Sequence, residues 1–345
     1  MAARFAPLSK GQIVTLAALA LLPLADLALP LVGVESLQLA SASRTVVIFA
    51  VMALGLNIVV GWTGLLNLGI AAFAAVGAYA FGILTWENYP FQLGFWPGLL
   101  AAGAIGAVAG VLLGAPTLRL RGDYLAIVTL GFGEIVQDAL KNLEGITKGT
   151  QGINPLPAPT IPAAVVSSET PVLWFYLYLA ILAVVVVLCR NLEFSRLGRQ
   201  WFSVREDELA ARCMAIEPDK AKLKAFATGA ALAAIAGALS ASALSSTGEP
   251  ANYDFSVSIL ALCIVIVGGI GSITGVLVGA IVMIGLSNVA LPLASEKLQE
   301  AGIGSTSNVL TSPINYKYLL FGLALVVMMR YRPDGIVHSR KAVRK

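Results

Sequence analysis

The chain has 345 residues, of which 58% are hydrophobic and only 12% are charged, and its mean hydropathy is +0.84. Soluble globular proteins carry about 25% charged residues, so the composition excludes an ordinary soluble domain and indicates an integral membrane protein. The net charge of +4 is modest and the basic residues gather at the ends of apolar segments, which argues for membrane orientation and against nucleic-acid binding.

The apolar segments divide the chain into a series of candidate membrane helices. We expect an all-α polytopic membrane protein with one transmembrane domain over residues 1–345 and about ten spanning helices of the usual length. The first segment follows Arg4 and Lys10 and has no small-residue cleavage site, so we expect a retained helix and not a signal peptide. The candidate spans lie near residues 12–34, 43–60, 65–84, 97–117, 124–140, 172–189, 223–245, 256–268, 276–291 and 316–330.

Basic residues mark one side of this predicted domain. They gather before the first span, after the fourth, between the sixth and the seventh, and after the last. Because the predicted crossings are even in number, these groups share one side, and the positive-inside rule makes that side the cytoplasm. We therefore expect both termini in the cytoplasm. The residues are Arg4, Lys10, Arg119, Arg121, Arg190, Arg196, Arg199, Arg205, Arg212, Lys220, Lys222, Lys224, Arg330, Arg332, Arg340, Lys341, Arg344 and Lys345.

The longest predicted outer loop, residues 142–171, contains four prolines and three glycines between residues 145 and 162. On this orientation it is a periplasmic loop. A structureless stretch of this length is uncommon in a compact domain unless it binds something. The loop is therefore either a docking segment or a passive linker.

Two glycine-rich turns interrupt the apolar segments in a comparable way. Residues 61–69 join the second and third spans, and residues 268–275 join the eighth and ninth. A pair of glycine-broken hydrophobic segments in corresponding halves of a transporter is a good pointer to the substrate path. We predict two pseudo-repeated halves, about 43–140 and 223–330. Alternatively, the glycines only allow close helix packing, as we expect for Gly106, Gly110 and Gly114 and for the pair Gly275 and Gly279.

A few polar residues lie inside the apolar segments. Carboxylates in a membrane are costly and usually face the bundle interior or water, so Asp26, Glu134 and Asp138 are functional candidates. For Asp138 we favour a helix end at the outer interface near Lys141. Glu134 fits either that interface or a functional position inside the bundle. Asn57, Asn67 and Thr129 either line a polar path or bond neighbouring helices. The residues that we assign to a translocation path are Asn57, Gly64, Asn67, Thr129, Glu134, Gly268 and Gly271.

A charged segment, residues 195–224, lies within a predicted cytoplasmic loop, residues 190–224. Ser203 and Glu206 form a capping-box pattern that predicts a helix starting at Val204, and Pro218 is expected to end it. Glu208 and Arg212 are four residues apart, in the favourable orientation for an ion pair. The predicted helix carries an apolar strip that needs a cover outside the membrane. The strip comprises Leu209, Ala210, Cys213, Met214 and Ile216.

The motifs of several enzyme classes are missing from the sequence. There is no GxxxxGK[ST] phosphate loop, so the chain does not bind ATP in the Walker manner by itself. No nucleophile–base pair stands out in a plausible pocket, and no cluster of histidine, cysteine and acidic residues suggests a metal site. We expect a protein that is not an enzyme and that has no cofactor or metal.

Six stretches carry a resemblance to a known family. They are GWTGLLNLG at 61–69, GDYLAIVTLGFGEI at 122–135, SRLGR at 195–199, REDELAA at 205–211, GGIGS at 268–272 and RPDGI at 332–336. With these motifs in order over residues 40–337, the chain resembles the permease subunits, of the LivM type, of branched-chain amino-acid ABC importers.

The resemblance implies an importer with a paralogous second permease, two ABC ATPase subunits and a periplasmic substrate-binding protein, in the bacterial inner membrane. It also implies that residues 204–216 form the coupling helix that docks in the ATPase. The family has glycine where this chain has Ala215, and alanine raises helix propensity by up to about 1 kcal/mol, which predicts an altered helix exit. The residues implied in coupling are Arg205, Glu206, Asp207, Glu208, Leu209, Ala210, Arg212, Cys213, Met214 and Ile216.

Three functional hypotheses follow. The first is a permease that moves branched-chain or similar amino acids into the cell by alternating access driven by partner ATPases, with urea or another small solute as alternative cargo. The second is a secondary transporter driven by an ion gradient, for which Asp26 and Glu134 would be a thin ionisable relay. The third is a membrane scaffold without transport, which the paired glycine breaks disfavour.

Overall fold

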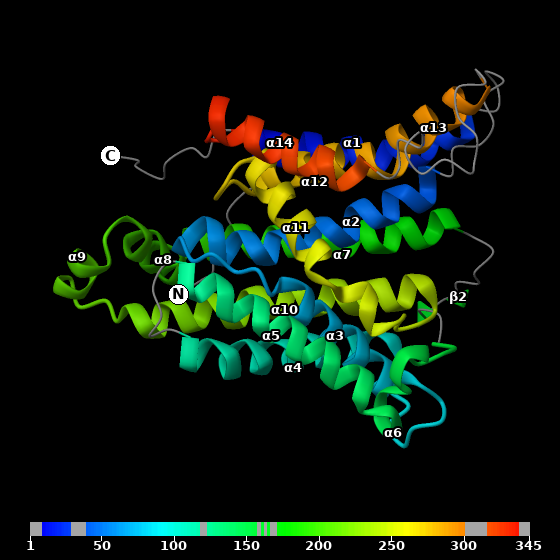
Figure 1. The fold of residues 1–345 in the computed structure, drawn as a ribbon, viewed down its shortest axis with the longest axis horizontal. Helices are drawn as coiled ribbons and strands as arrows, with labels where there is room; N and C mark the ends of the chain where they lie inside the picture. The colour runs from blue at the N-terminus through cyan, green and yellow to red at the C-terminus, as the bar shows by residue number, and fades with distance from the viewer. Residues whose placement is uncertain are drawn as a thin grey trace.

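A computed structural model of the chain describes residues 9–28, 39–117, 123–156, 160–161, 164–165, 171–300 and 316–337. Over these residues the protein is a bundle of helices that run roughly along one direction (Figure 1). The helices with ten or more residues are α1 Lys10–Ala28, α2 Leu39–Asn57, α3 Ile70–Thr85, α4 Phe95–Thr117, α5 Asp123–Asn142, α7 Pro171–Phe194, α8 Arg196–Glu206, α10 Pro218–Leu244, α11 Phe255–Gly268, α12 Ile273–Gly285, α13 Leu291–Glu300 and α14 Lys317–Tyr331.

Shorter elements extend or connect these helices. The π-helix η2 Ile58–Trp62 continues α2, and the π-helix η5 Leu286–Ala290 joins α12 to α13. The others are α6 Glu144–Thr147, the 3-10 helix η3 Gly149–Gln151, strands β1 Thr160–Ile161 and β2 Ala164–Val165, α9 Glu208–Cys213 and the 3-10 helix η4 Pro250–Tyr253.

The helical fold agrees with the predicted class. Each predicted span overlaps a described helix, and within the described part of the chain six helical stretches are long and apolar enough to cross a membrane. They are Ala42–Trp62, Phe95–Pro116, Leu173–Phe194, Pro218–Leu244, Pro250–Gly268 and Ile273–Glu296. Lys10–Leu21 and Ile70–Thr85 are shorter apolar helices. The predicted number of crossings and the pseudo-repeated halves therefore stay predictions.

Helix α10 forms the centre of the bundle and packs against α2, α3 and α4. Its sequence is rich in alanine and glycine, which lets backbones approach closely. A Cβ atom at Gly237 would collide with the Ala74 carbonyl of α3, and one at Gly106 of α4 would collide with Ala234. Gly110 and Gly114 of α4 also face α10, and Gly275 and Gly279 of α12 face α11. The prediction that these small residues pack helices together is confirmed.

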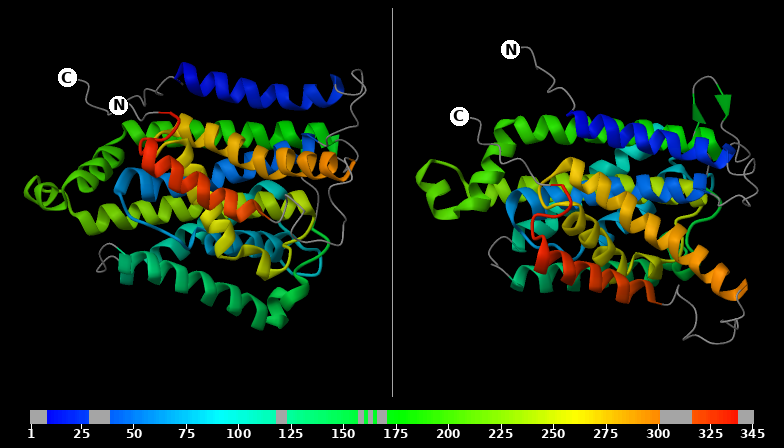
Figure 2. Two further views of the ribbon diagram at one scale, coloured as in Figure 1. Left: turned by 45° about the horizontal axis from the view of Figure 1, so that its top comes forward. Right: turned by 90° about the horizontal axis from the view of Figure 1, so that it is seen from above.

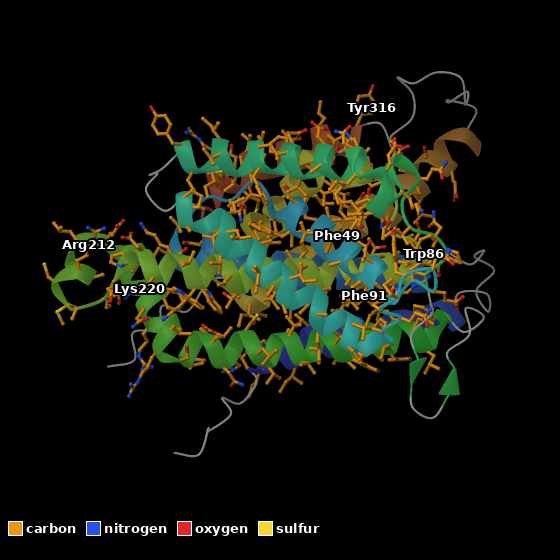
Figure 3. The ribbon with its side chains drawn as sticks, turned by 90° about the horizontal axis from the view of Figure 1, so that it is seen from below. Phe49, Trp86, Phe91, Arg212, Lys220 and Tyr316 are labelled. Atoms are coloured by element: carbon orange, nitrogen blue, oxygen red, sulfur yellow. The ribbon has the colours of Figure 1, made fainter. Side chains whose placement is uncertain are left out.

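The two ends of the bundle differ in character. Helices α8 and α9 project at one end, and α6 and the β1–β2 pair lie toward the other (Figure 1). Helix α1 begins and α14 ends toward the α8–α9 end (Figure 2). Arg212 and Lys220 mark this charged end, opposite Trp86 (Figure 3). Arg4, Arg119, Arg121 and the basic tail after residue 337 lie outside the described residues, so the orientation of the termini stays a prediction.

The outer loop is more ordered than its sequence suggested. Its described part contains α6, η3 and the antiparallel pair β1–β2, in which Thr160 is opposite Val165. Backbone bonds also tie it to the turn after α10: Leu156 N donates to Ser245 O at 2.9 Å, and Thr247 N donates to Ile153 O at 3.2 Å. The expectation of a structureless stretch is wrong here, because the turn after α10 supplies partners that the sequence could not reveal.

Candidate functional site

The charged segment folds as two short helices and not as one. Helix α8 begins after Ser195, whose side chain accepts a hydrogen bond from Gly198 N at 3.2 Å. The predicted capping role of Ser203 is wrong: Ser203 lies inside α8 and its Oγ donates to Arg199 O at 2.9 Å. The helix starts earlier because Trp201 and Val204 are buried against the bundle, which stabilises the preceding turns.

Asp207 separates the two helices and starts the second. Its backbone is extended, and its carboxylate accepts hydrogen bonds from Leu209 N at 2.8 Å and Ala210 N at 3.0 Å. This is the N-cap arrangement that aspartate favours. Helix α9 therefore begins at Glu208, and Glu206 ends α8.

The exit from α9 also differs from its prediction. The helix ends at Cys213, and Pro218 occupies the first turn of α10, where proline is well tolerated. The expected end of the helix at Pro218 is therefore wrong. Ala215 has φ +59, a left-handed conformation that costs an alanine about 1–2 kcal/mol. The expectation drawn from helix propensity does not apply to Ala215, because this residue lies beyond the helix.

Glu208 fastens α9 to the centre of the bundle. The predicted ion pair with Arg212 is confirmed, at 3.0 Å. The second oxygen of Glu208 lies 2.8 Å from Lys222 of α10, and only 7% of the Lys222 side chain is exposed. A buried lysine needs a charged partner, so Glu208 holds α9 in a fixed place beside α10. In the sequence Lys222 is only one of several basic loop residues, and nothing near it in the chain indicates this role.

The apolar strip of α9 is exposed in part. Leu209 is 74% exposed and Met214 is 77% exposed, and Ala210 and Cys213 are exposed beside them. Ile216 is half-buried and packs against the core, so its assignment to the exposed strip is wrong. Ala211 is buried on the inner face of the helix.

The two glycine-rich turns meet in space. Gly271 N donates to the Asn57 side-chain oxygen at 2.8 Å, and Trp62 Nε1 donates to Gly271 O at 3.2 Å. A Cβ atom at Gly61 would collide with both Asn57 and Gly271. We call Asn57, 61–62 and 268–271 the glycine junction. The structure thus brings together Asn57 and Gly271 from opposite parts of the chain, and Gly268, three residues before Gly271, packs on Gly275 of α12.

Helix α8 lies against the glycine junction. The Trp62 ring stacks on Trp201 with centroids 5.9 Å apart and is also 5.9 Å from Phe202. The Arg205 guanidinium donates to the carbonyl oxygen of Gly61, and its side chain packs on Gly64, which has φ +73. Neither Trp62 nor Trp201 was a candidate site residue on sequence alone. The only signal was a tryptophan inside a glycine-rich turn.

Asn67 and Thr129 hold the stretch that leads from the junction into α3. Asn67 Oδ1 accepts from Gly69 N at 2.9 Å, and Thr129 Oγ1 accepts from Leu68 N at 3.1 Å. Thr129 Oγ1 also donates to Ala126 O at 2.9 Å. Both side chains are buried, so they tie this stretch to itself and to α5.

Glu134 is exposed on α5, beside a small hollow. Two buried polar side chains in the hollow are bonded to backbone: Gln137 donates to Pro250 O at 3.2 Å, and Ser258 accepts from Ala71 N at 3.1 Å. No described atom lies within 4 Å of a Cβ built at Gly131 or Gly133. The residues that line the hollow together with Glu134 include Leu68, Gly133, Gln137, Tyr253 and Ser258.

The remaining carboxylates are placed as follows. Asp138 is 3.6 Å from Lys141 with 68% of its side chain exposed, which agrees with the expected helix end. The side chain of Asp26 lies outside the described residues. Of the three candidate carboxylates, Glu134 is therefore the one within the described residues whose position in the middle of a helix needs a functional explanation.

Comparisons with known proteins show the family of the chain. The model of the family described as the permease component of branched-chain amino acid transport systems matches residues 38–329. The chain is 38% identical over 311 residues to the high-affinity branched-chain amino acid transport system permease protein LivM of Salmonella typhimurium, covering 84% of this chain and 68% of that protein. LivM of Escherichia coli has the same identity and coverage.

A more distant relative is the permease protein LivH of Salmonella typhimurium, at 23% identity over 305 residues, covering 84% of this chain and 91% of LivH. No solved structure matches the chain. The extent of the family match and the identity to LivM decide the classification: the chain belongs to the family of permease components of branched-chain amino acid transport systems.

Proposed function

We propose that this permease subunit imports branched-chain or similar amino acids by alternating access, with ATP hydrolysed by partner subunits. The family supports the substrate class. In this proposal the complex contains a paralogous second permease, two ABC ATPases and a periplasmic binding protein, and it lies in the bacterial inner membrane. The α8–α9 end faces the cytoplasm, where the ATPases are.

One observation carries the coupling role of α9. The six-residue helix α9 presents Leu209 and Cys213 outward, Met214 directly after it is exposed beside them, and Glu208 anchors the helix to the buried Lys222. A short helix with an uncovered apolar strip is suited to a groove in another protein. The rigid anchor means that force applied to the strip reaches α10. Of the residues that the resemblance implied, the exposed apolar ones are suited to docking, and Glu208 and Ile216 are suited to holding the helix.

The face of α5 supports a path between two permease subunits. Glu134 is exposed on it, together with apolar residues such as Ile127, which is 65% exposed, and Ile135, which is 67% exposed. A carboxylate in the middle of a membrane helix rarely faces lipid and usually faces protein or water. We therefore assign this face to the second permease, with Glu134 and the small residues Gly131 and Gly133 lining the path. The other residues assigned to the path form its movable inner wall. They are Asn57, Gly64, Asn67, Thr129, Gly268 and Gly271.

The test is uptake of radiolabelled leucine into liposomes that contain the complete complex. The chain is co-expressed with a paralogous permease, two ATPases and a binding protein encoded beside it. We expect uptake that requires ATP inside and the binding protein outside, and that excess valine or isoleucine inhibits. An ATPase variant unable to hydrolyse ATP is the matched control.

Other outcomes separate the alternatives. Inhibition by urea and not by valine would assign a different cargo to the same machine. Uptake by the purified chain alone, driven by an ion gradient without ATP, would contradict the ATP-driven mechanism and favour a secondary transporter.

A further inference from the structure

Helix α8 is attached to the membrane helices by more than its covalent connection. Trp201 is fully buried, its Nε1 donates to Ala221 O of α10 at 2.8 Å, and its ring stacks on Trp62 at the end of η2. Arg205, near the end of α8, donates to the carbonyl oxygen of Gly61. Together they hold the last turn of η2 from two sides.

The same turn of η2 is bonded to the second glycine-rich turn. The Trp62 ring that α8 holds donates to Gly271 O at 3.2 Å, and Asn57, one turn earlier, accepts from Gly271 N at 2.8 Å. Gly271 therefore has both its backbone groups bonded to the α2–η2 segment. Trp62 therefore links α8 to the turn between α11 and α12.

The glycine junction has the features of a movable element. Residues 61–62 of its first half lie in a π-helix, a rare form that is frequent at functional sites. Gly269 and Gly271 have φ +132 and +87, which glycine adopts readily. Asn57 is 1% exposed, and among the described residues its side-chain nitrogen has no hydrogen-bond acceptor. An unpaired buried donor is a source of strain that a second arrangement can relieve.

We propose that Trp62, Trp201 and Arg205 form a clamp that transmits movement of α8 and α9 to the glycine junction. This inference rests on the proposed function and deepens it. Trp62 and Trp201 act as positioning residues: they contact neither substrate nor ATPase, and they set the arrangement of Gly271 and Asn57 according to the position of α8. Although Arg205 lies on the exposed face of α8, its guanidinium donates to the carbonyl oxygen of Gly61. Its role is therefore within the permease and not in docking.

Static packing is the competing explanation. In that case Trp62 and Trp201 only fill space, and a change in Arg205 disturbs nothing beyond the Gly61–Gly64 turn that it touches. The two explanations differ at residues 268–275, which the clamp reaches only through Trp62 and Asn57.

The test uses three variants of the full chain in the complete complex in lipid nanodiscs. Arg205→Leu keeps an apolar stem over Gly64 but removes the donor to Gly61, and Arg205→Lys restores a cationic donor. Trp62→Phe keeps a ring against Trp201 but removes the donor to Gly271. Arg196→Ala, at an exposed position at the start of the same helix, is the matched control. Assembly of the complex on size-exclusion chromatography verifies folding.

Two quantities are measured: amide hydrogen exchange in residues 268–275, and leucine molecules imported per ATP hydrolysed. For Arg205→Leu and Trp62→Phe we expect exchange to accelerate and transport per ATP to fall, each by about tenfold, a typical size for coupling between two sites. ATP hydrolysis itself should continue. Arg205→Lys should recover most of both quantities, and Arg196→Ala should change neither.

The clamp is overturned if exchange in residues 268–275 is unchanged, or if exchange rises while transport per ATP stays at the wild-type value. If the wild-type complex shows no ATP-dependent uptake, the proposed function fails. The exchange measurement still decides in that case, because unchanged exchange overturns the clamp and accelerated exchange supports the mechanical link. If Arg205→Leu does not assemble, Trp62→Phe supplies the same two measurements, and unchanged exchange or unchanged transport per ATP in that variant overturns the clamp.

Discussion

The α10 core and the glycine junction both depend on glycine, but in opposite ways. In the core, Gly237 and Gly106 lie inside regular helices. Each is in close van der Waals contact with the backbone or an alanine side chain of the neighbouring helix. In the junction, Gly61 lies inside a π-helix beside a stacked tryptophan pair, and Gly271 is hydrogen-bonded to that distant segment. On the clamp proposal, close glycine packing makes a rigid wall where helices are regular and a movable contact where they are interrupted.

Four predictions test this comparison, ordered by their expected effect on stability. The largest effect is expected in the core. Gly237→Val places a side chain against the Ala74 backbone carbonyl, and neither helix can move without separating from its neighbours. Overpacking of this kind costs about 1–3 kcal/mol and occasionally more, so we expect little folded protein on fluorescence-detected size-exclusion chromatography. Gly322→Ala in α14, where a Cβ meets no described atom within 4 Å, is the control and should fold normally.

The second prediction concerns the anchor of α9. Glu208→Ala leaves Lys222 buried without its carboxylate, and because 28% of the Glu208 side chain is exposed we expect a loss of about 2 kcal/mol, below the full value for a buried pair. Thermal unfolding in detergent measures the loss, and transport per ATP should fall with it. Asp219→Ala, which removes only the 3.9 Å contact with Arg212, should leave both nearly unchanged. Equal effects of the two variants would contradict the anchoring role.

The third prediction concerns the turn after α9. Ala215→Gly relieves a left-handed alanine with φ +59, so we expect stability to rise by about 1 kcal/mol. The measurement is the unfolding midpoint of the purified subunit. Ala210→Gly, inside α9, should instead lower the midpoint. A lower midpoint for Ala215→Gly would show that the turn is not strained.

The smallest effect on stability, with a large effect on function, is expected at the exposed strip. Leu209→Asp introduces a charge at a residue that is 74% exposed, in the first turn of α9, where acids interact favourably with the helix dipole. The subunit should unfold at the wild-type temperature while the ATPases no longer co-purify with it. Retained co-purification and uptake would assign the docking surface elsewhere.

The sequence predicted the regular parts of the molecule well and the irregular parts poorly. Spans such as 223–245 were recognisable because continuous apolar length is a property of the local chain. The Ser203 cap was misplaced because Ser195 and Asp207 also fit the cap pattern, and burial of Trp201 decided between them. Lys222 looked like one more loop lysine, since nothing in its neighbours reveals an acid 14 residues away.

The candidate site shows the same division. The two glycine-rich turns were identified from composition alone, because glycine density marks positions where backbone conformation or close approach matters. Their direct contact, more than 200 residues apart in the chain, could not be predicted without the fold. Trp62 and Trp201 became candidates for a function only when packing placed one ring on the other.

By itself, the sequence determined that this is a helical membrane protein with a charged segment between apolar halves, because hydropathy and chain length leave few other structures possible in lipid. The tertiary structure alone decided that the charged segment is two helices, that Lys222 anchors the second, and that Arg205 and Trp201 reach the glycine junction. The physical reason is that membrane insertion depends on local composition, whereas ion pairs, stacked rings and backbone contacts depend on which distant segments the packing of glycine and alanine brings together.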